Sequence, residues 1–296
     1  MISPVIDITD LTKYYGKAKG IERVSLEIGE GEIFGFIGPN GAGKSTTIRI
    51  LMNLIFPTSG SARIFGMDVV RKTKEIKRIT GYVPSDANAY SSMDVEEFLV
   101  YCSRFHGIQS GRERITALSE MFALDLRRKI ADLSFGNRKK VSIVQSLIHN
   151  PRLLIADEPS TGLDPLMQAA FFDLLRAENR KGMTIFYSSH ILSEVQQLCK
   201  KVAIIKDGKI IQVEDIETLR KKQLKKVFIG FDSESGAGSF ILPGMDEPVS
   251  RSGNMLSFMY SGDINELVRK VSQMNLANLM IEEPSLDEIF MHYYKS

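Results

Sequence analysis

Three continuous runs of apolar residues occur in the first two thirds of the chain. They are EIFGFIG at 32–38, RLLIADEP at 152–159 and MTIFYSSH at 183–190. Continuous runs of this length, without regular alternation, are typical of strands in a sheet that is covered on both faces. A helical pattern from Lys44 through Leu54 follows the first run. The order of strand, loop and helix predicts an α/β core.

A mostly helical insertion is predicted between Ser85 and Asn150, where the pattern shows no clear strand. The last helix of this segment has one apolar face, formed by Val141, Val144, Leu147 and Ile148. Residues 85–150 are therefore expected to form a helical subdomain of the α/β domain.

The composition changes near LRKKQLKK at 219–226. Beyond it, three apolar stretches, a Gly/Ser-rich turn, a helix at about 264–274 and a last helix from about Leu286 indicate a small α+β domain. We predict one domain at 1–222 and an accessory domain at 223–296. The basic residues at the junction are predicted to be the solvated face of a linker helix, with contact to anionic lipid as the alternative. They are Arg220, Lys221, Lys222, Lys225 and Lys226.

Composition and charge narrow the classes of partner. The 296 residues, 43% of them hydrophobic, are enough to bury a full core. The 38 basic and 36 acidic residues give a formal net charge of +2, so no nucleic-acid partner is expected. Two distant cysteines, Cys102 and Cys199, exclude a disulfide framework and indicate a reducing cytosol. The apolar runs are too short to cross a bilayer, so a membrane role would need a membrane-spanning partner.

The segment GPNGAGKST fits the phosphate-loop pattern between a predicted strand and a predicted helix. Its glycines allow backbone N–H groups to surround the β- and γ-phosphates, and the helix N-terminus adds positive potential. Lys44 is expected to bridge these phosphates, and the Ser45 hydroxyl to face Mg²⁺. A glycine-rich turn with a chance lysine is the alternative. The residues predicted to bind nucleotide in this loop are Gly38, Pro39, Asn40, Gly41, Ala42, Gly43, Lys44, Ser45 and Thr46.

Two carboxylates and a histidine follow the other apolar runs. Asp157 ends the second run and is the expected Mg²⁺ partner. Glu158 comes just after it, where a side chain can turn toward the γ-phosphate and polarise the attacking water. His190 ends the third run and is placed to hydrogen-bond the γ-phosphate and the water. Two acids capping a strand in solvent, and a structural histidine, are the alternatives.

The ordered set GPNGAGKST, LSFGN, LLIADEP, STGLD and SSH resembles the ATP-binding subunit of ATP-binding-cassette (ABC) transporters. The resemblance covers about Ile6 to Glu214. It implies an ABC-type phosphate-loop ATPase core that uses ATP and Mg²⁺. It also implies that Lys44, Glu158 and His190 are catalytic and that Tyr15 stacks on adenine.

LSFGN stands where the family has Leu-Ser-Gly-Gly-Gln. Its last four residues, Ser134, Phe135, Gly136 and Asn137, are called the signature loop here. The resemblance implies that cassettes pair head to tail, as a homodimer or a heterodimer, so that this loop contacts the partner's ATP. Asp164 of STGLD falls in the segment that the family calls the D-loop. Sequence geometry alone does not exclude contact of the signature loop with ATP in the same chain.

GYVPSD at 81–86 resembles the family segment in which a glutamine follows the proline, but this chain has Ser85 there. The family's glutamine contacts Mg²⁺ and senses the membrane partner. Serine is shorter and cannot span the same distance. Either Asp86 or a water replaces that contact, or the contact with the metal is weak.

The segments GYVPSDANAYSSMDVEEFL and EEPSLDEIF resemble the bacterial export branch of the family. That branch pairs with a separately encoded permease and handles drugs, peptides or lipids. The resemblance implies a cytoplasmic subunit held at the inner face of the membrane by the permease. A non-transport ABC ATPase acting on a nucleoprotein is the alternative function, although this chain shows one cassette and no sustained heptads. A GTPase lacks support, since no Asn-Lys-x-Asp or Thr-Lys-x-Asp stretch occurs.

Overall fold

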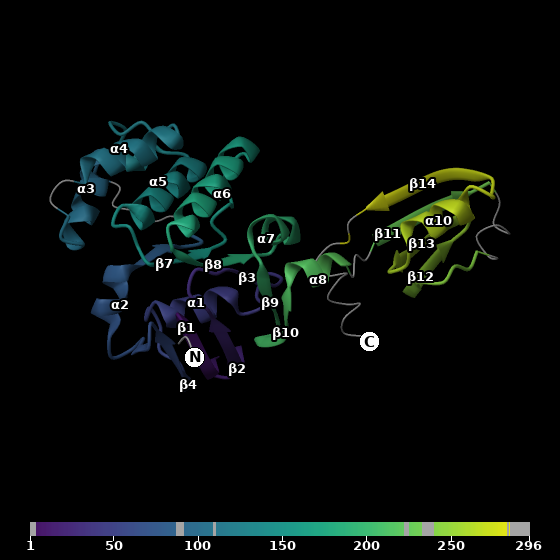
Figure 1. The fold of residues 1–296 in the computed structure, drawn as a ribbon, viewed down its shortest axis with the longest axis horizontal. Coiled ribbons are helices and arrows are strands. Elements are labelled where there is room, and N and C mark those ends of the chain that lie inside the picture. The colour runs from purple at the N-terminus through teal and green to yellow at the C-terminus, as the bar shows by residue number, and fades with distance from the viewer. Residues whose placement is uncertain are drawn as a thin grey trace. The chain divides into compact units, whose positions relative to one another are not determined.

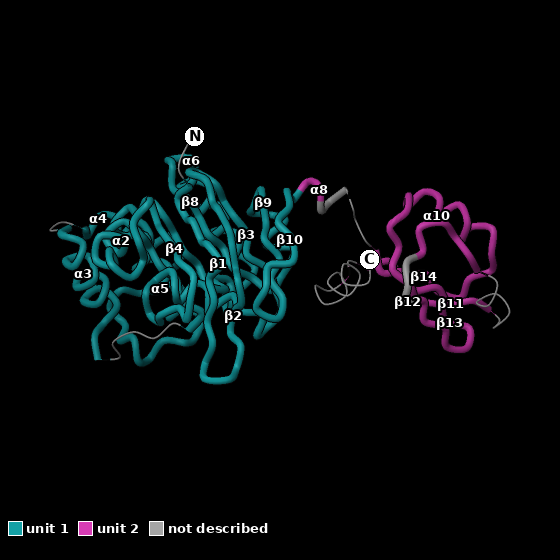
Figure 2. The backbone as a smooth tube through the Cα atoms, turned by 90° about the horizontal axis from the view of Figure 1, so that it is seen from below, with its two compact units in different colours: residues 1–216 teal, residues 217–296 magenta. Residues whose placement is uncertain are grey.

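A computed structural model describes residues 4–86, 92–108, 111–221, 225–232, 240–282 and 284. The chain divides into two compact units, Met1–Ile216 and Glu217–Ser296, which Figure 2 draws in separate colours. The domain boundary expected from the sequence, at 222–223, lies a few residues further along and stays a prediction.

A six-stranded sheet forms the centre of the first unit, in the order β10-β9-β3-β8-β7-β6. All of its neighbouring strands run parallel except β10, which pairs antiparallel with β9. Every residue of β3, β7 and β8 is buried, so the three continuous apolar runs are central strands, as predicted. The strands are β3 (Ile33–Ile37), β6 (Thr80–Val83), β7 (Leu153–Asp157), β8 (Thr184–Ser189), β9 (Lys201–Lys206) and β10 (Lys209–Asp215).

A second, antiparallel sheet in this unit has the order β2-β1-β4-β5. Its apolar side chains share one core with α1 and the parallel sheet, through Leu11, Ile48 and Ile155 among others. Helix α1 ends at Leu51 rather than at the predicted Leu54, and Asn53 has a φ of 48°. These elements are β1 (Ile6–Tyr15), β2 (Ala18–Ile28), α1 (Lys44–Leu51), β4 (Ser59–Ile64) and β5 (Met67–Asp68).

The predicted helical insertion contains α3, α4, a 3₁₀ turn and α5. Figure 1 shows α3, α4 and α5 gathered away from β1 and β2. Asp94 and Glu97 form a capping box that fixes the start of α3. Within 92–108 and 111–150, only an isolated bridge between Asp94 and Lys129 has strand geometry. The helices of the first unit, besides α1, are α2 (Thr73–Ile79), α3 (Val95–Phe105), α4 (Arg112–Met121), the 3₁₀ turn η1 (Ile130–Asp132), α5 (Phe135–Leu147), α6 (Pro165–Arg180) and α7 (Leu192–Leu198).

The second unit contains a four-stranded antiparallel sheet in the order β12-β13-β11-β14, covered by α10. Leu267 and Val271 of α10 pack into a core that includes Phe240 and Phe258. The predicted α+β character is therefore present, and the predicted last helix from about Leu286 lies outside the described residues. Helix α8 (Ile216–Lys221) begins at the last residue of the first unit. The other elements are β11 (Lys225–Phe231), β12 (Met245–Ser252), β13 (Met255–Tyr260), α10 (Ile264–Val271) and β14 (Leu276–Glu282).

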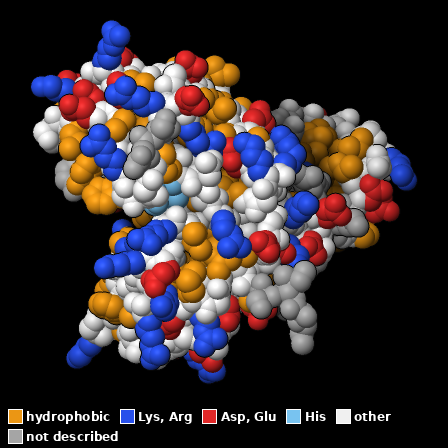
Figure 3. Space-filling model, turned by 60° about the vertical axis from the view of Figure 1, so that its left-hand side comes forward, with side chains coloured by type: hydrophobic (Ala, Val, Ile, Leu, Met, Phe, Trp, Pro, Cys, Tyr) orange, Lys and Arg blue, Asp and Glu red, His pale blue; other side chains and the backbone are white. Residues whose placement is uncertain are grey.

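The basic run at the junction does not form one helical face. Arg220 and Lys221 end α8, whereas Lys225 and Lys226 begin β11. The expectation of a single linker helix is therefore wrong for the last two, because pairing of Lys226 with Met259 in β13 continues the sheet to this point. On the face drawn in Figure 3, Lys and Arg side chains alternate with acidic and apolar ones instead of forming one continuous basic surface.

No helix in the described part of the chain is both long enough and apolar enough to span a membrane.

Candidate functional site

The phosphate loop connects the buried strand β3 to α1, and its close packing explains two of its glycines. A Cβ at Gly38 would lie 2.3 Å from the carbonyl oxygen of Ile205, and one at Gly43 would lie 2.6 Å from Cγ2 of Ile21. Gly43 also has a φ of 108°, which disfavours any residue with a side chain. The loop can therefore follow this path only with glycine at both positions.

A cavity of about 280 Å³ lies over this loop and the start of α1. Ser85 and Glu158 form the rest of its wall, although they come from distant parts of the sequence. The cavity therefore brings seven of the nine predicted loop residues together with two predicted residues from elsewhere. Its lining is Asn40, Gly41, Ala42, Gly43, Lys44, Ser45, Thr46, Ser85 and Glu158.

Gly38 and Pro39 do not line the cavity but hold Lys44, which does. The Lys44 Nζ donates hydrogen bonds to the carbonyl oxygens of Gly38 at 2.6 Å and Pro39 at 3.1 Å. The same ammonium forms an ion pair with Glu158 Oε1 at 3.1 Å. These contacts hold the ammonium at the cavity. Because Lys44 is buried, water screens its charge only weakly.

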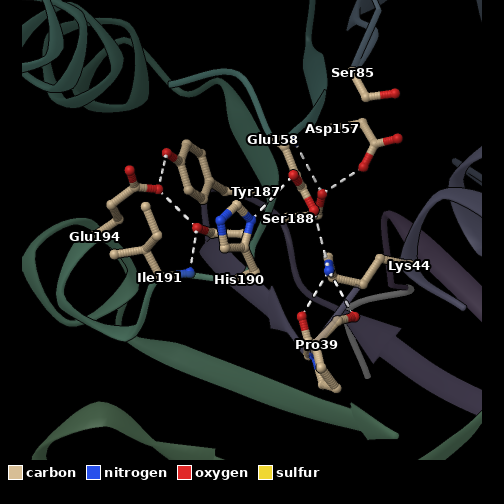
Figure 4. A network of polar contacts seen from close by, with 12 residues as sticks. Pro39, Lys44, Ser85, Asp157, Glu158, Tyr187, Ser188, His190, Ile191 and Glu194 are labelled. Atoms are coloured by element: carbon tan, nitrogen blue, oxygen red, sulfur yellow. Dashed lines mark hydrogen bonds and ion pairs between the residues drawn. The ribbon is translucent and has the colours of Figure 1, made fainter. Parts of the chain in front are cut away.

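Glu158 connects Lys44 to His190. Its other oxygen, Oε2, lies 3.1 Å from Nδ1 of His190 (Figure 4). Glu158 adopts a φ of 46° directly after β7, and its backbone N–H bonds to Ser188. This left-handed turn ends the alternation of the strand and points the carboxylate toward the phosphate loop. The structure thus brings the three residues predicted to be catalytic into one chain of contacts.

Asp157 is fully buried at the end of β7. Its Oδ1 accepts a hydrogen bond from Ser188 Oγ at 2.7 Å, whereas its Oδ2 is buried and has no partner among the described residues. An unpaired buried carboxylate oxygen is costly, so this atom is suited to a cation or an ordered water.

A buried carboxylate that sequence reasoning missed, Glu194, organises the segment around His190. It accepts a hydrogen bond from Tyr187 Oη at 3.0 Å (Figure 4). It also accepts hydrogen bonds from Ser189 Oγ at 2.7 Å and Gln168 Nε2 at 2.7 Å. Ser189 Oγ in turn accepts from the backbone N–H of Ile191 at 2.9 Å. The residues on both sides of His190 are therefore fixed through one carboxylate.

We expect Glu194→Gln to lower ATP turnover while leaving ATP affinity close to that of the native chain. The amide would present an N–H group to two hydroxyl donors, and a mismatched buried polar group costs about 1–3 kcal/mol. Steady-state kinetics measures the turnover, equilibrium binding the ATP affinity, and denaturant unfolding the loss of stability. Glu178→Gln is the matched control, because Glu178 is another buried carboxylate but pairs with Arg114 away from His190. Equal loss of turnover in both variants would contradict a role in positioning His190.

Tyr15 lies beside the phosphate-loop helix. A Cβ on Gly20 would touch both Cε2 of Tyr15, at 2.8 Å, and Cγ2 of Thr46, at 3.3 Å. Tyr15 is 47% exposed, and Lys13 Nζ lies 5.4 Å from the centroid of its ring. Neighbouring Tyr14 instead donates its hydroxyl to Glu22. Of these two tyrosines, Tyr15 is the exposed ring next to the loop.

The signature loop does not line the cavity of its own chain. Ser134 caps α5, with its Oγ accepting from the N–H of Asn137 at 3.3 Å. Phe135, which replaces a family glycine, is 42% exposed and packs on Gly162, where a Cβ would lie 2.5 Å from its ring. Gly136 also approaches Gly162, since a Cβ on Gly136 would lie 2.4 Å from the Gly162 carbonyl oxygen.

Asp164 caps the start of α6 and accepts a hydrogen bond from the N–H of Met167 at 3.0 Å. It follows Gly162 closely in the chain, so the D-loop segment and the signature loop are neighbours within one chain. The cavity and this pair of loops are separate features of the first unit.

A second residue that sequence reasoning missed is Lys139 in α5. Its Nζ donates to the carbonyl oxygens of Pro84 and Ser85. A lysine in a basic stretch such as NRKK is expected to be exposed, so the sequence does not indicate that Lys139 is buried.

The comparisons with known proteins agree with this fold. Residues 21–161 match the family model for ABC transporters. The bacitracin transport ATP-binding protein BcrA of Bacillus licheniformis is 37% identical over 230 residues, which cover 76% of this chain and 74% of BcrA. The linearmycin resistance ATP-binding protein LnrL of Bacillus subtilis (strain 168) is 28% identical and covers 97% of each chain. A dimeric post-hydrolysis structure of the ATP-binding cassette MJ0796, bound to ADP and Pi, has a TM-score of 0.66 and 26% identity, covering 71% of this chain and 98% of that one.

The fold and the site define a phosphate-loop ATPase cassette with a helical subdomain. The chain belongs to the ABC transporter family, in which it is an ATP-binding and ATP-hydrolysing subunit. The predicted family, fold class and ATPase activity are therefore confirmed.

Proposed function

We propose that this chain binds ATP with Mg²⁺ in the cavity, pairs head to tail with a second cassette, and powers export through a separately encoded permease. The observation that carries the proposal is the separation of two half-sites. The cavity holds Lys44 and Glu158, whereas Ser134 and Gly136 lie outside it on the same unit. Each half-site is complete only when a second copy or a homologous cassette supplies the other.

Residues in the cavity wall and outside it have distinct roles in ATP binding and hydrolysis. The Lys44 ammonium binds the β- and γ-phosphates, and Glu158 accepts a proton from the attacking water. His190, held by Glu158 and by the Glu194 network, orients that water. The Tyr15 ring provides an exposed surface for stacking on adenine.

The oxygen atoms near the phosphate loop fit Mg²⁺. Asp157 offers a buried, unpartnered carboxylate oxygen, and Ser45 offers a hydroxyl on the cavity wall. Hard oxygen ligands of this kind are those that Mg²⁺ prefers. When bound, the ion would supply positive charge to the phosphates.

The names of two relatives support the export assignment. BcrA is named for bacitracin transport and LnrL for linearmycin resistance. We assign the transported compounds to the class of drugs, peptides or lipids, and place the chain at the inner face of the membrane through its permease.

Reconstitution with the permease encoded beside this chain tests the proposal. In liposomes, ATP turnover is expected to rise when the permease is present and to rise again with a transported peptide antibiotic. Free ribosomes or DNA should not change turnover. Stimulation by either of these, with none by the permease, would instead establish the alternative of an ABC ATPase that acts on a nucleoprotein.

A further inference from the structure

Lys139 is a charged residue with no exposed surface, since its relative exposure is 0%. Lysine is almost never fully buried unless its ammonium has partners. Burial lowers its pKa to about 8, opposed by the attraction of Asp157, Glu158 and Asp86. The partners of this ammonium therefore determine which parts of the cassette Lys139 connects.

The ammonium joins two parts of the cassette that are far apart in sequence. Its Nζ donates to the carbonyl oxygen of Pro84 at 2.8 Å and to that of Ser85 at 2.9 Å. Pro84 and Ser85 follow strand β6, and Ser85 belongs to the wall of the cavity. A movement of this wall is therefore transmitted directly to Lys139.

Lys139 is also close to the signature loop. Helix α5 starts there, and Ser134 is its N-terminal cap. The five steps along the helix from Ser134 to Lys139 correspond to about 7.5 Å of helix rise. A hydrogen-bonded helix of this length moves as one body, so the signature loop and the ammonium move together.

We propose that Lys139 is a positioning residue that ties the Ser85 loop to the signature helix, so that ATP in the cavity changes the position of Ser134 and Gly136. The inference rests on the proposed head-to-tail function. The link uses the backbone carbonyls of Pro84 and Ser85, so it does not depend on the side chain at position 85.

Lys139→Met is the main variant, because methionine keeps the length of the side chain but makes no hydrogen bond to the two carbonyls. Lys139→Gln provides partial rescue, since its amide can donate to one of them. Lys140→Met is the matched control. It removes the same charge from the next position of α5 and leaves both hydrogen bonds intact.

Hydrogen–deuterium exchange on the monomer measures the link directly. The amides of Asn137 and Arg138, which bond to Ser134, report on the signature loop. In the native chain and in Lys140→Met, ATP is expected to slow their exchange at least about fivefold. In Lys139→Met the slowing should fall below about twofold, while ATP affinity stays within about twofold of native. Lys139→Gln should lie between the two.

Three results would overturn the inference. One is that ATP slows the exchange of these amides equally in Lys139→Met and in the native chain. Another is that ATP does not slow the exchange of these amides in the native chain. That result would rule out the proposed link even if Lys139→Met does not fold. A third is that ATP affinity falls in Lys139→Met by as large a factor as the ATP-dependent slowing of amide exchange. Lys139 would then belong to the ATP-binding site itself.

Dimer formation separates this inference from the function on which it rests. In a Glu158→Gln background, ATP-dependent dimers should form at least about tenfold less readily with Lys139→Met than with Lys140→Met. Equal dimer formation in the two would count against the link. If Glu158→Gln alone forms no dimer with ATP, the head-to-tail function fails, and the exchange of the monomer still decides the role of Lys139.

Discussion

Replacing Glu158 with glutamine is expected to lower ATP turnover roughly 10²–10⁴-fold and to hold the chain in an ATP-bound dimer. Glutamine has almost the same shape as glutamate, so the cavity is preserved. It cannot accept the proton of the attacking water. ATP then remains in the cavity and continues to join the two half-sites.

The contacts of Glu158 indicate that ATP affinity should not fall in this variant. Its carboxylate pairs with the Lys44 ammonium at 3.1 Å, and the phosphates of ATP require the same ammonium. Removing the negative charge of Glu158 removes this competition. We therefore expect ATP to bind the Glu158→Gln protein at least as tightly as the native chain.

Light scattering with and without ATP measures the dimer, and single-turnover hydrolysis measures the rate. Adding Ser134→Arg should abolish the ATP-dependent dimer, because it places a bulky cation at the cap of the signature helix. Glu30→Gln is the control for the charge change, since Glu30 is exposed and pairs with Arg152 outside the site. A dimer that forms equally without ATP would reflect contact through residues 217–296 and would contradict the head-to-tail arrangement.

The part of the fold that follows from the sequence is the part with a regular pattern. Strands β3, β7 and β8 are buried on both faces, and their continuous apolar runs identify them. Strands β1 and β2 give no such signal. Their pairing shifts register between Ile8 and Leu11, and Asp10 there has a φ of 45°. A bulge of this kind interrupts the alternation by which an antiparallel strand is recognised.

The functional site shows the same difference between residues that a sequence pattern identifies and residues that it does not. Lys44, Glu158 and His190 each follow a buried strand, and the C-terminal edge of a parallel sheet brings such residues together. Their contact could therefore be anticipated from their order in the chain. Lys139 and Glu194 could not be identified in this way. Lys139 contacts the carbonyl of Pro84, 55 residues away, because α5 packs on β6. Glu194 contacts Gln168, 26 residues away, as well as the nearby Tyr187 and Ser189, because α7 packs on β8.

Replacing Lys44 with alanine is expected to weaken ATP binding roughly 100-fold or more. The ammonium is buried and directed at the cavity by the carbonyls of Gly38 and Pro39. Two charge-assisted hydrogen bonds to phosphate, at about 1.5–3 kcal/mol each, account for a loss of that size. The variant also removes the Lys44 partner of Glu158, so a half-buried carboxylate that keeps only its contact with His190 would then face the phosphates.

Equilibrium titration with ATP measures the affinity of the Lys44→Ala protein, and a thermal unfolding curve shows whether it remains folded. Arg49→Ala is the matched control, because Arg49 lies on the exposed face of the same helix and its loss changes the net charge equally. The double variant Lys44→Ala, Glu158→Gln should recover part of the affinity, since the side chain that faces the phosphates is then neutral. Native affinity in Lys44→Ala, or equal losses in Lys44→Ala and Arg49→Ala, would show that the backbone of the phosphate loop alone binds the nucleotide.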